Sequence, residues 1–138
     1  MSTAADKLLA WHSKQSYEFP WRKEYDPYKI WISEIMLQQS QVNVVLPYYN
    51  QWMIKFPSIK SLSNAKLDDL LLLWQGLGYY NRAKNILKTA KIITKKHNGK
   101  LPKNSKDLIL LPGIGKYTAA AIASICNTEK IPMVNMTS

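Results

Sequence analysis

Apolar positions recur along most of the chain at the three- to four-residue spacing of a helix, and no stretch sustains the alternation of a strand. The pattern predicts helices over 4–13, 28–39, 42–55, 65–74, 80–96, 105–110 and 116–126. The links between them are short, and neither a repeat nor a low-complexity segment interrupts them. The sequence therefore predicts an all-α domain of six or seven helices.

Residues at the helix ends support these limits. Pro27 suits the first turn of the helix over 28–39, because proline lacks the N–H that would be unpaired there. Asn64 and Ser105 are the expected caps of the helices that follow them. Gly76 and Gly78 predict a tight turn, which would bring the helices over 65–74 and 80–96 close together.

Charge is distributed unevenly along the chain. The 138 residues include 19 Lys and Arg against 9 Asp and Glu, a formal net charge of +10. Between Leu70 and Lys106 there is no acid, and nine basic residues lie between Arg82 and Lys106. Four of them share one face of the helix over 80–96, namely Lys84, Lys88, Lys91 and Lys95. This face favours an acidic partner such as nucleic acid, although a simply solvated basic face fits the pattern equally well.

Composition excludes several classes of protein. Apolar residues make up 46% of the chain, enough to bury a core, so intrinsic disorder is not expected. No apolar run is long enough for a membrane span, and the N-terminus lacks the apolar segment of a secretory signal. Cys126 is the single cysteine, so an internal disulfide and a four-cysteine metal site are both excluded. A cytoplasmic location and no protein-bound metal are expected.

The segment LPGIGKYTAA at 111–120 joins two predicted helices through a turn with two glycines. Gly113 and Gly115 permit unusual backbone angles and place no side chain between the backbone and a ligand. The helix that follows begins at once, so its free N–H groups can hold a DNA phosphate, and Lys116 and Thr118 can add side-chain contacts. A bare Gly-x-Gly is more often an ordinary link between helices, but the flanking residues and the basic helix upstream favour DNA.

This segment resembles the helix-hairpin-helix of the DNA glycosylase superfamily that includes endonuclease III. Four further segments resemble the adenine DNA glycosylases within it: PWR at 20–22, DPY at 26–28, WISEIMLQQSQV at 31–42 and LWQGLGYYNRA at 73–83. The resemblance covers residues 8–134. It implies a six-helix barrel domain over 28–126 with the hairpin at 111–118, an N-terminal helix and connector over 1–27, and a divergent tail over 127–138.

Glu34 is the candidate catalytic acid. It is the only acid between Pro27 and Leu67, and its neighbours on a helix include Ile30, Trp31 and Leu37. An apolar setting disfavours the charged form and should raise the carboxyl pKa toward neutrality, which suits a general acid. By spacing alone an ordinary surface glutamate is the commoner case. The resemblance implies that Glu34 protonates an extruded adenine and helps to position water.

The resemblance also implies a set of DNA contacts. Gln39 and Tyr79 match positions that insert into the duplex, because the target base must leave the stack. The positions on the side of the orphaned 8-oxoguanine are Gln38, Ser40 and Leu77. Those of the adenine pocket are Trp21, Arg22 and Leu37. The remaining DNA contacts, which include the DNA backbone, are Arg82, Gly113, Gly115, Lys116 and Thr118. An ordinary core position is the less favoured alternative for Tyr79, Trp21 and Leu37.

Tyr117 separates two branches of this superfamily. Bifunctional relatives carry a lysine at this position, whose amine attacks the sugar to form a Schiff base. A tyrosine cannot do this, and Lys116 lies one position away. The resemblance therefore implies a monofunctional enzyme of base excision repair, which removes adenine opposite 8-oxoguanine or guanine without cleaving the strand. A thymine-mismatch glycosylase, which can also carry this tyrosine, is the alternative enzyme.

The chain departs from the family after Val134. Asn135 stands where the family has an aspartate that stabilises positive charge on the sugar, and an amide carries no charge. The family's second half-domain, with four cysteines for a 4Fe–4S cluster, is expected to be missing from this truncated chain. We therefore expect impaired catalysis or a non-catalytic DNA-binding remnant. The expected partner is a duplex with an A:8-oxoguanine or A:G mismatch, bound by a monomer at a bacterial nucleoid.

Overall fold

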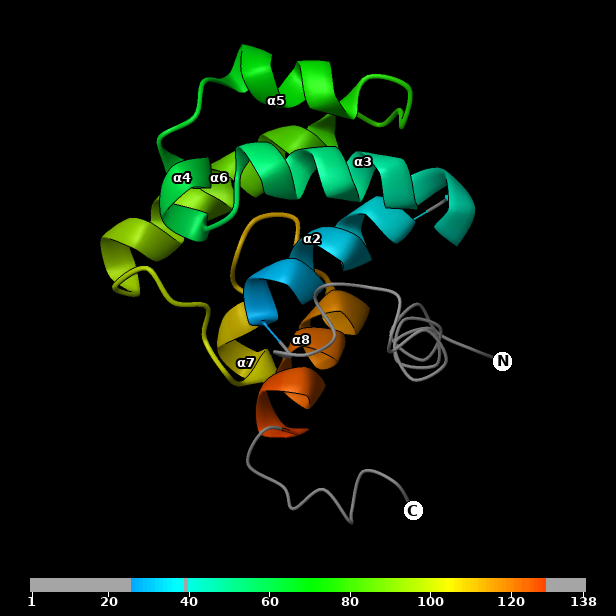
Figure 1. The fold of residues 1–138 in the computed structure, drawn as a ribbon. Coiled ribbons are helices and arrows are strands. Elements are labelled where there is room, and N and C mark those ends of the chain that lie inside the picture. The colour runs from blue at the N-terminus through cyan, green and yellow to red at the C-terminus, as the bar shows by residue number, and fades with distance from the viewer. Residues whose placement is uncertain (1–25, 39, 129–138) are drawn as a thin grey trace.

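The computed structural model describes residues 26–38 and 40–128, and these residues are helical without any strand (Figure 1). The helices are α2 (Pro27–Leu37), α3 (Val42–Lys55), α4 (Ile59–Ser63), α5 (Leu67–Trp74), α6 (Asn81–Lys96), α7 (Ser105–Leu108) and α8 (Lys116–Thr128). The predicted all-α class is confirmed. The predicted helix over 4–13, the connector and most of the tail lie outside the described residues.

Helix α2 is the central element of this arrangement. The side chain of Asp26 accepts a hydrogen bond from the backbone N–H of Tyr28, and Pro27 occupies the first turn as predicted. From Ile30 to Met36 every side chain is buried, on all faces of the helix. The reason is that α3 packs on one side of α2 and α8 on another, as Figure 1 shows. A helix buried all round needs no polar face, and α2 has none.

Aromatic side chains fill the space between α2, α3 and α5. The indole of Trp52 packs edge-to-face against Trp74 at 5.8 Å and against Phe56 at 5.3 Å. Its N–H donates to the Tyr28 hydroxyl at 3.0 Å, which in turn donates to the Phe56 carbonyl at 2.6 Å. These bonds satisfy the buried indole N–H of Trp52 and the buried hydroxyl of Tyr28.

Helix α6 confirms the amphipathic pattern of its sequence. Ala83, Ile86, Leu87, Ala90 and Ile93 are buried, and they pack toward α4 and α5. The four lysines of the predicted basic face are exposed. The helix ends where Asn98 and Gly99 adopt left-handed backbone angles, with φ of 57° and 80°.

Two predicted helix caps are wrong, one helix was not predicted, and several other helix limits differ from the prediction by one to two residues. The short helix α4 was not predicted, and Ser58 caps it through a hydrogen bond from the Ser61 backbone at 3.1 Å. Asn64 therefore ends α4 instead of capping the next helix. Asn104, not Ser105, caps α7 by accepting from the Asp107 backbone at 2.9 Å. In each case a polar residue stands near the correct end, and which one caps depends on the direction of the incoming chain.

Candidate functional site

The hairpin between α7 and α8 is held in place by α6. The hydroxyl of Thr89 donates to the carbonyl oxygen of Pro112 at 2.6 Å. Gly113 has a φ of 78°, and a Cβ built there would lie 2.7 Å from the Cβ of Asn85. A side chain at Gly113 is therefore excluded both by the backbone angle and by α6.

The outer side of the hairpin is open. Gly115, Lys116 and Tyr117 are exposed, and a Cβ at Gly115 would meet nothing within 4 Å. Helix α8 begins at Lys116, so the N–H groups of its first turn have no partner within the helix. An exposed helix start beside an exposed lysine is suited to an anion such as a phosphate.

Glu34 has the burial that the sequence predicted. The side chain is 1% exposed, and neither carboxylate oxygen has a hydrogen-bond partner among the described residues. Burial raises the pKa of Glu34 from 4.5 to about 7, because the charged form loses its hydration. A carboxyl with a pKa near neutrality keeps a substantial protonated fraction there, and that form can donate a proton to a ligand.

The turn between α5 and α6 presents Tyr79 to the outside. Gly76 and Gly78 have positive φ, as the predicted tight turn requires, and Tyr79 does too, with a φ of 52°. This angle is unfavourable for a residue with a Cβ. In addition, the Tyr79 side chain is 63% exposed. A strained residue with an exposed aromatic ring is more typical of a binding surface than of a core.

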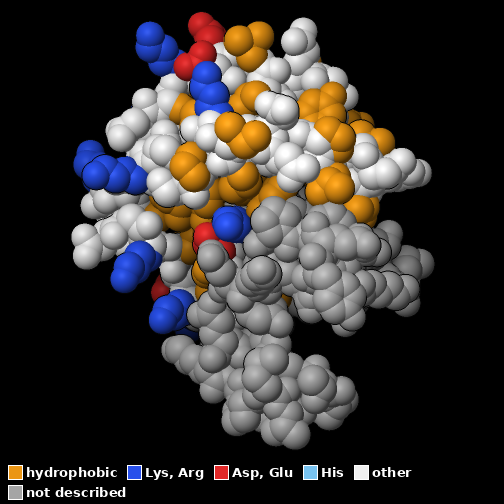
Figure 2. All heavy atoms as spheres, in the orientation of Figure 1, with side chains coloured by type: hydrophobic (Ala, Val, Ile, Leu, Met, Phe, Trp, Pro, Cys, Tyr) orange, Lys and Arg blue, Asp and Glu red, His pale blue; other side chains and the backbone are white. Residues whose placement is uncertain are grey.

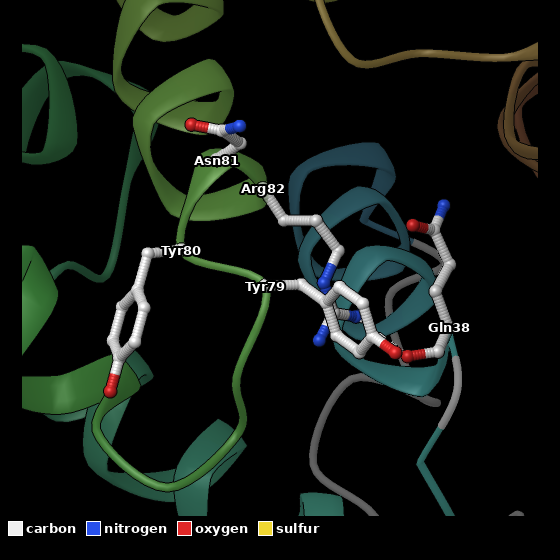
Figure 3. A pocket seen from close by; sticks show the side chains of 5 residues that line it. All are labelled: Gln38, Tyr79, Tyr80, Asn81 and Arg82. Atoms are coloured by element: carbon white, nitrogen blue, oxygen red, sulfur yellow. Dashed lines mark hydrogen bonds between the residues drawn. The ribbon is translucent and has the colours of Figure 1, made fainter.

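Three elements meet where α2 ends. The side-chain amide of Gln38 donates to the hydroxyl of Thr118 on α8 at 3.4 Å. Arg82 on α6 donates to the carbonyl oxygens of Ile35 and Gln38, each at 2.7 Å. A pocket of about 500 Å³ opens beside them, lined by Gln38, Tyr79, Tyr80, Asn81 and Arg82. Figure 3 shows Tyr79 lying against Arg82 and toward Gln38, while Tyr80 points away.

The structure distributes the predicted DNA contacts between the surface and the interior. Tyr79, Gly115, Lys116 and Tyr117 are exposed, and Leu37, Gln38 and Ser40 are half-buried. Leu77 and Thr118 are buried, and the Arg82 guanidinium is directed at backbone carbonyls. Trp21, Arg22, Gln39 and Asn135 lie outside the described residues. For all of these residues, contact with DNA or substrate stays a prediction.

Some residues that shape this region were not identified from the sequence. Thr89 and Asn85 hold the hairpin from α6, and the indole N–H of Trp74 donates to the Gly78 carbonyl at 2.9 Å. A threonine within the apolar stripe of α6 was the one available signal for Thr89. No local pattern indicates which loop such a hydroxyl will meet.

The residues present do not fit a 4Fe–4S cluster. Such a cluster takes four cysteine thiolates, whereas this chain has one cysteine, Cys126, which is buried in α8. Among the described residues no three His, Cys, Asp or Glu side chains gather at one point. In the same part of the chain no helix is long and apolar enough to cross a bilayer.

Residues 32–134 match the HhH-GPD superfamily of base excision DNA repair proteins. The chain belongs to this superfamily. The match includes the hairpin and the helix that carries Glu34, and it confirms the superfamily indicated by the sequence motifs.

Among curated proteins, the chain is similar to adenine DNA glycosylases. Adenine DNA glycosylase from Buchnera aphidicola is 51% identical over 119 residues, which cover 86% of this chain and 34% of that protein. The human adenine DNA glycosylase is 40% identical over 127 residues, covering 86% of this chain and 23% of its own length. The predicted resemblance to adenine DNA glycosylases is confirmed, and the chain spans about a third of the first relative and about a quarter of the second.

Solved structures share the fold. A thermostable thymine-DNA glycosylase superposes with a TM-score of 0.73 at 27% identity, covering 94% of this chain and 60% of that one. An endonuclease III in a non-covalent complex with DNA gives a TM-score of 0.68 at 23% identity, covering 90% and 60%. These similarities confirm the fold class that the motifs implied.

Proposed function

We propose that this chain binds duplex DNA at a mispaired adenine, as part of the machinery of a monofunctional adenine DNA glycosylase acting on A:8-oxoguanine and A:G. The observation that carries the proposal is the buried carboxyl of Glu34, whose pKa is raised to about 7. It lies on the helix that ends at Gln38, and Gln38 lines one pocket with Tyr79 and bonds to Thr118 in the first turn of α8. A buried carboxyl on a helix whose end adjoins two features suited to DNA supports the proposal.

The chemistry proposed for Glu34 is proton transfer to a ring nitrogen of the extruded adenine. Protonation lets the base accept the electron pair of the glycosidic bond as that bond breaks. Water then adds to the positively charged sugar carbon and releases a proton to Glu34, now ionised. The excised base and the hydroxylated sugar balance the reaction, and no covalent enzyme intermediate is needed.

The binding part of the proposal assigns the surface to the duplex. The exposed N-terminus of α8 and Lys116 hold a backbone phosphate, and the Tyr79 ring fills the gap that the extruded base leaves. Tyr117 at the start of α8 has no amine, so Schiff-base chemistry and strand cleavage are not expected. We expect a monomer to bind one mismatch, without an iron–sulfur cluster, at the nucleoid of a bacterial cell.

Asn135 supports a second candidate, DNA binding without efficient excision. A neutral amide at the position of the family aspartate stabilises an oxocarbenium-like sugar less than a carboxylate does. We therefore propose that excision by this chain is impaired, and that Asn135→Asp increases it. Faster excision by Asn135→Asp would by itself support the proposal that Asn135 impairs excision.

Single-turnover release of adenine from an A:8-oxoguanine duplex, with binding followed in parallel, tests these proposals. We expect tight, mismatch-preferring binding, slow excision, faster excision by Asn135→Asp and none by Glu34→Gln. Excision that survives Glu34→Gln would exclude Glu34 as the acid. Release of thymine from a G:T duplex instead of adenine would favour the thymine-mismatch alternative, and absence of duplex binding would refute the proposed function.

A further inference from the structure

The terminal nitrogens of Arg82 are directed at backbone carbonyls from two separate elements. One nitrogen, Nη1, donates to the carbonyl oxygens of Ile35 and Gln38 at 2.7 Å each, at the end of α2. The other, Nη2, donates to those of Leu77 and Gly78 at 3.4 and 3.3 Å, in the turn that carries Tyr79. A guanidinium is the side chain suited to this, because its donors are fixed in one plane.

The end of α2 has no cation of its own. No basic residue lies in its last turn, so the carbonyls there are left to a partner from elsewhere. Arg82 on α6 supplies both the donors and the positive charge that a helix C-terminus favours. The backbone of Gln38, and with it the end of the Glu34 helix, is thereby tied to α6.

The Tyr79 turn is held by the same side chain. The guanidinium carbon of Arg82 lies 5.5 Å from the centre of the Tyr79 ring and 5.3 Å from that of Trp74. Both distances are within the range of a cation–π contact. Without these contacts the backbone of Tyr79 would be free to leave its unfavourable positive φ, and this change would redirect the ring.

We propose that Arg82 is a positioning residue that fixes the exposed Tyr79 ring and the end of α2 in a single arrangement, so that base extrusion and the Glu34 carboxyl are brought to the same point. This role rests on the proposed function, and it differs from a direct DNA contact. The N–H donors at the tip of the side chain are engaged within the protein, and Nε is buried.

The experiment measures base extrusion separately from excision. A duplex with 2-aminopurine, an adenine isomer, opposite 8-oxoguanine fluoresces more strongly when the base leaves the stack. The full chain is compared at saturating protein with Arg82→Lys, which keeps the charge but not the planar fork. We expect an extrusion equilibrium about tenfold smaller, equivalent to about 1.4 kcal/mol.

A second variant guards against a loss of fold. Arg82→Met keeps an apolar stem against Trp74 and buries no ammonium group, so we expect it to remain folded and to lose extrusion equally. All fluorescence is read at a temperature at which circular dichroism shows the variants folded. Lys60→Met, which removes an exposed cation on α4 outside the proposed DNA contact, is the control and should retain wild-type fluorescence.

The outcomes separate this inference from the proposed function. If the wild type gives no fluorescence increase, base extrusion itself is refuted. Suppose instead that the wild type gives a fluorescence increase that Tyr79→Ala removes. If folded Arg82→Lys or Arg82→Met then keeps this increase, Arg82 is merely structural and the inference is overturned. Loss of extrusion in both folded Arg82 variants, with Lys60→Met unchanged, supports the inference.

Discussion

The hydroxyl of Thr89 donates to the carbonyl oxygen of Pro112 at 2.6 Å, which joins the middle of α6 to the start of the glycine turn. Thr89 is fully buried and Pro112 is half-buried, so water has limited access to this bond. Removing the donor leaves the Pro112 carbonyl without this partner, which carries a cost in stability. The placement of the hairpin is therefore linked to α6 and not only to its own glycines.

Replacing Thr89 by valine should loosen the hairpin. Valine has nearly the same shape but no donor, so we expect a loss of about 1–3 kcal/mol in the free energy of unfolding and weaker duplex binding. Chemical denaturation and a binding titration check both effects. Thr94→Val, at an exposed position of the same helix, is the control. Equal stability of the two variants would contradict a structural role for the Thr89 bond.

The two glycines of the hairpin should respond differently to alanine. Gly113→Ala places a Cβ against Asn85 at a positive φ, and we expect it to destabilise the fold by about 1–3 kcal/mol. Gly115→Ala meets open space and should leave the melting temperature nearly unchanged. A bulky residue at Gly115 should then weaken DNA binding in a folded protein. Wild-type affinity in Gly115→Phe would argue against a phosphate at this turn.

Glu34 should make stability depend on pH. Its pKa is about 7 in the folded chain and 4.5 ordinarily, so the unfolded chain ionises first as the pH rises. Stability is then fully present below about pH 4.5, falls as the pH rises toward 7, and is constant above that. Relative to Glu34→Gln, the wild type should lose up to about 3 kcal/mol between pH 4.5 and pH 8. Urea denaturation at the two pH values measures this difference, and an unchanged difference would contradict the raised pKa.

The same titration predicts the direction of any pH dependence of excision. Because the donor must be protonated, single-turnover rates should fall as the pH rises through about 7. The Asn135→Asp variant is suited to this measurement, since we expect it to be the faster enzyme. A rate that rises with pH over this range would exclude Glu34 as the donor in the rate-limiting step.

Salt dependence should report the phosphate contact at the hairpin. Neutralising one phosphate-binding cation lowers the slope of log affinity against log salt by about one. We expect this change for Lys116→Gln, which lies at the exposed start of α8, and not for Lys60→Gln on α4. Identical slopes for both variants would place Lys116 outside the DNA contact.

The sequence predicted the helices well wherever a periodic apolar face determines them. The limits of α3 agree with the prediction over 42–55, and α6 has the predicted buried and basic faces. The short α4 was missed because five residues hold too little periodicity to be recognised. Its capping serine was visible, but a serine before a short apolar run is equally typical of a loop.

The candidate site was predicted residue by residue but not as an arrangement. The apolar neighbours of Glu34 favoured a buried acid only together with the family resemblance, because spacing alone is more typical of a surface glutamate, and the exposed hairpin followed from its glycines. The role of Arg82 could not be derived, because its partners are backbone carbonyls and these have no signature in the sequence. Arg82 was predicted to bind DNA, whereas its terminal nitrogens donate to carbonyls within the protein.

On the face of the molecule drawn in Figure 2, basic and apolar side chains occupy different regions. Lys and Arg side chains gather toward the left of the face shown in Figure 2, and apolar side chains stand over α3 and α5. Val44, Ile54 and Leu72 are the exposed large apolar residues of those helices. The proposed DNA contact concerns none of these three residues.

The burial of α2 on every side determines which partner must move. Glu34 cannot swing outward, because displacing it would drag Trp31 and Met36 out of the tightly packed interior. Under the proposed function, a nucleotide that reaches this carboxyl must therefore travel to it, and the distortion falls on the double helix. Mispairs that already stack poorly need less distortion, so a rigid acid would favour damaged DNA before any base is read.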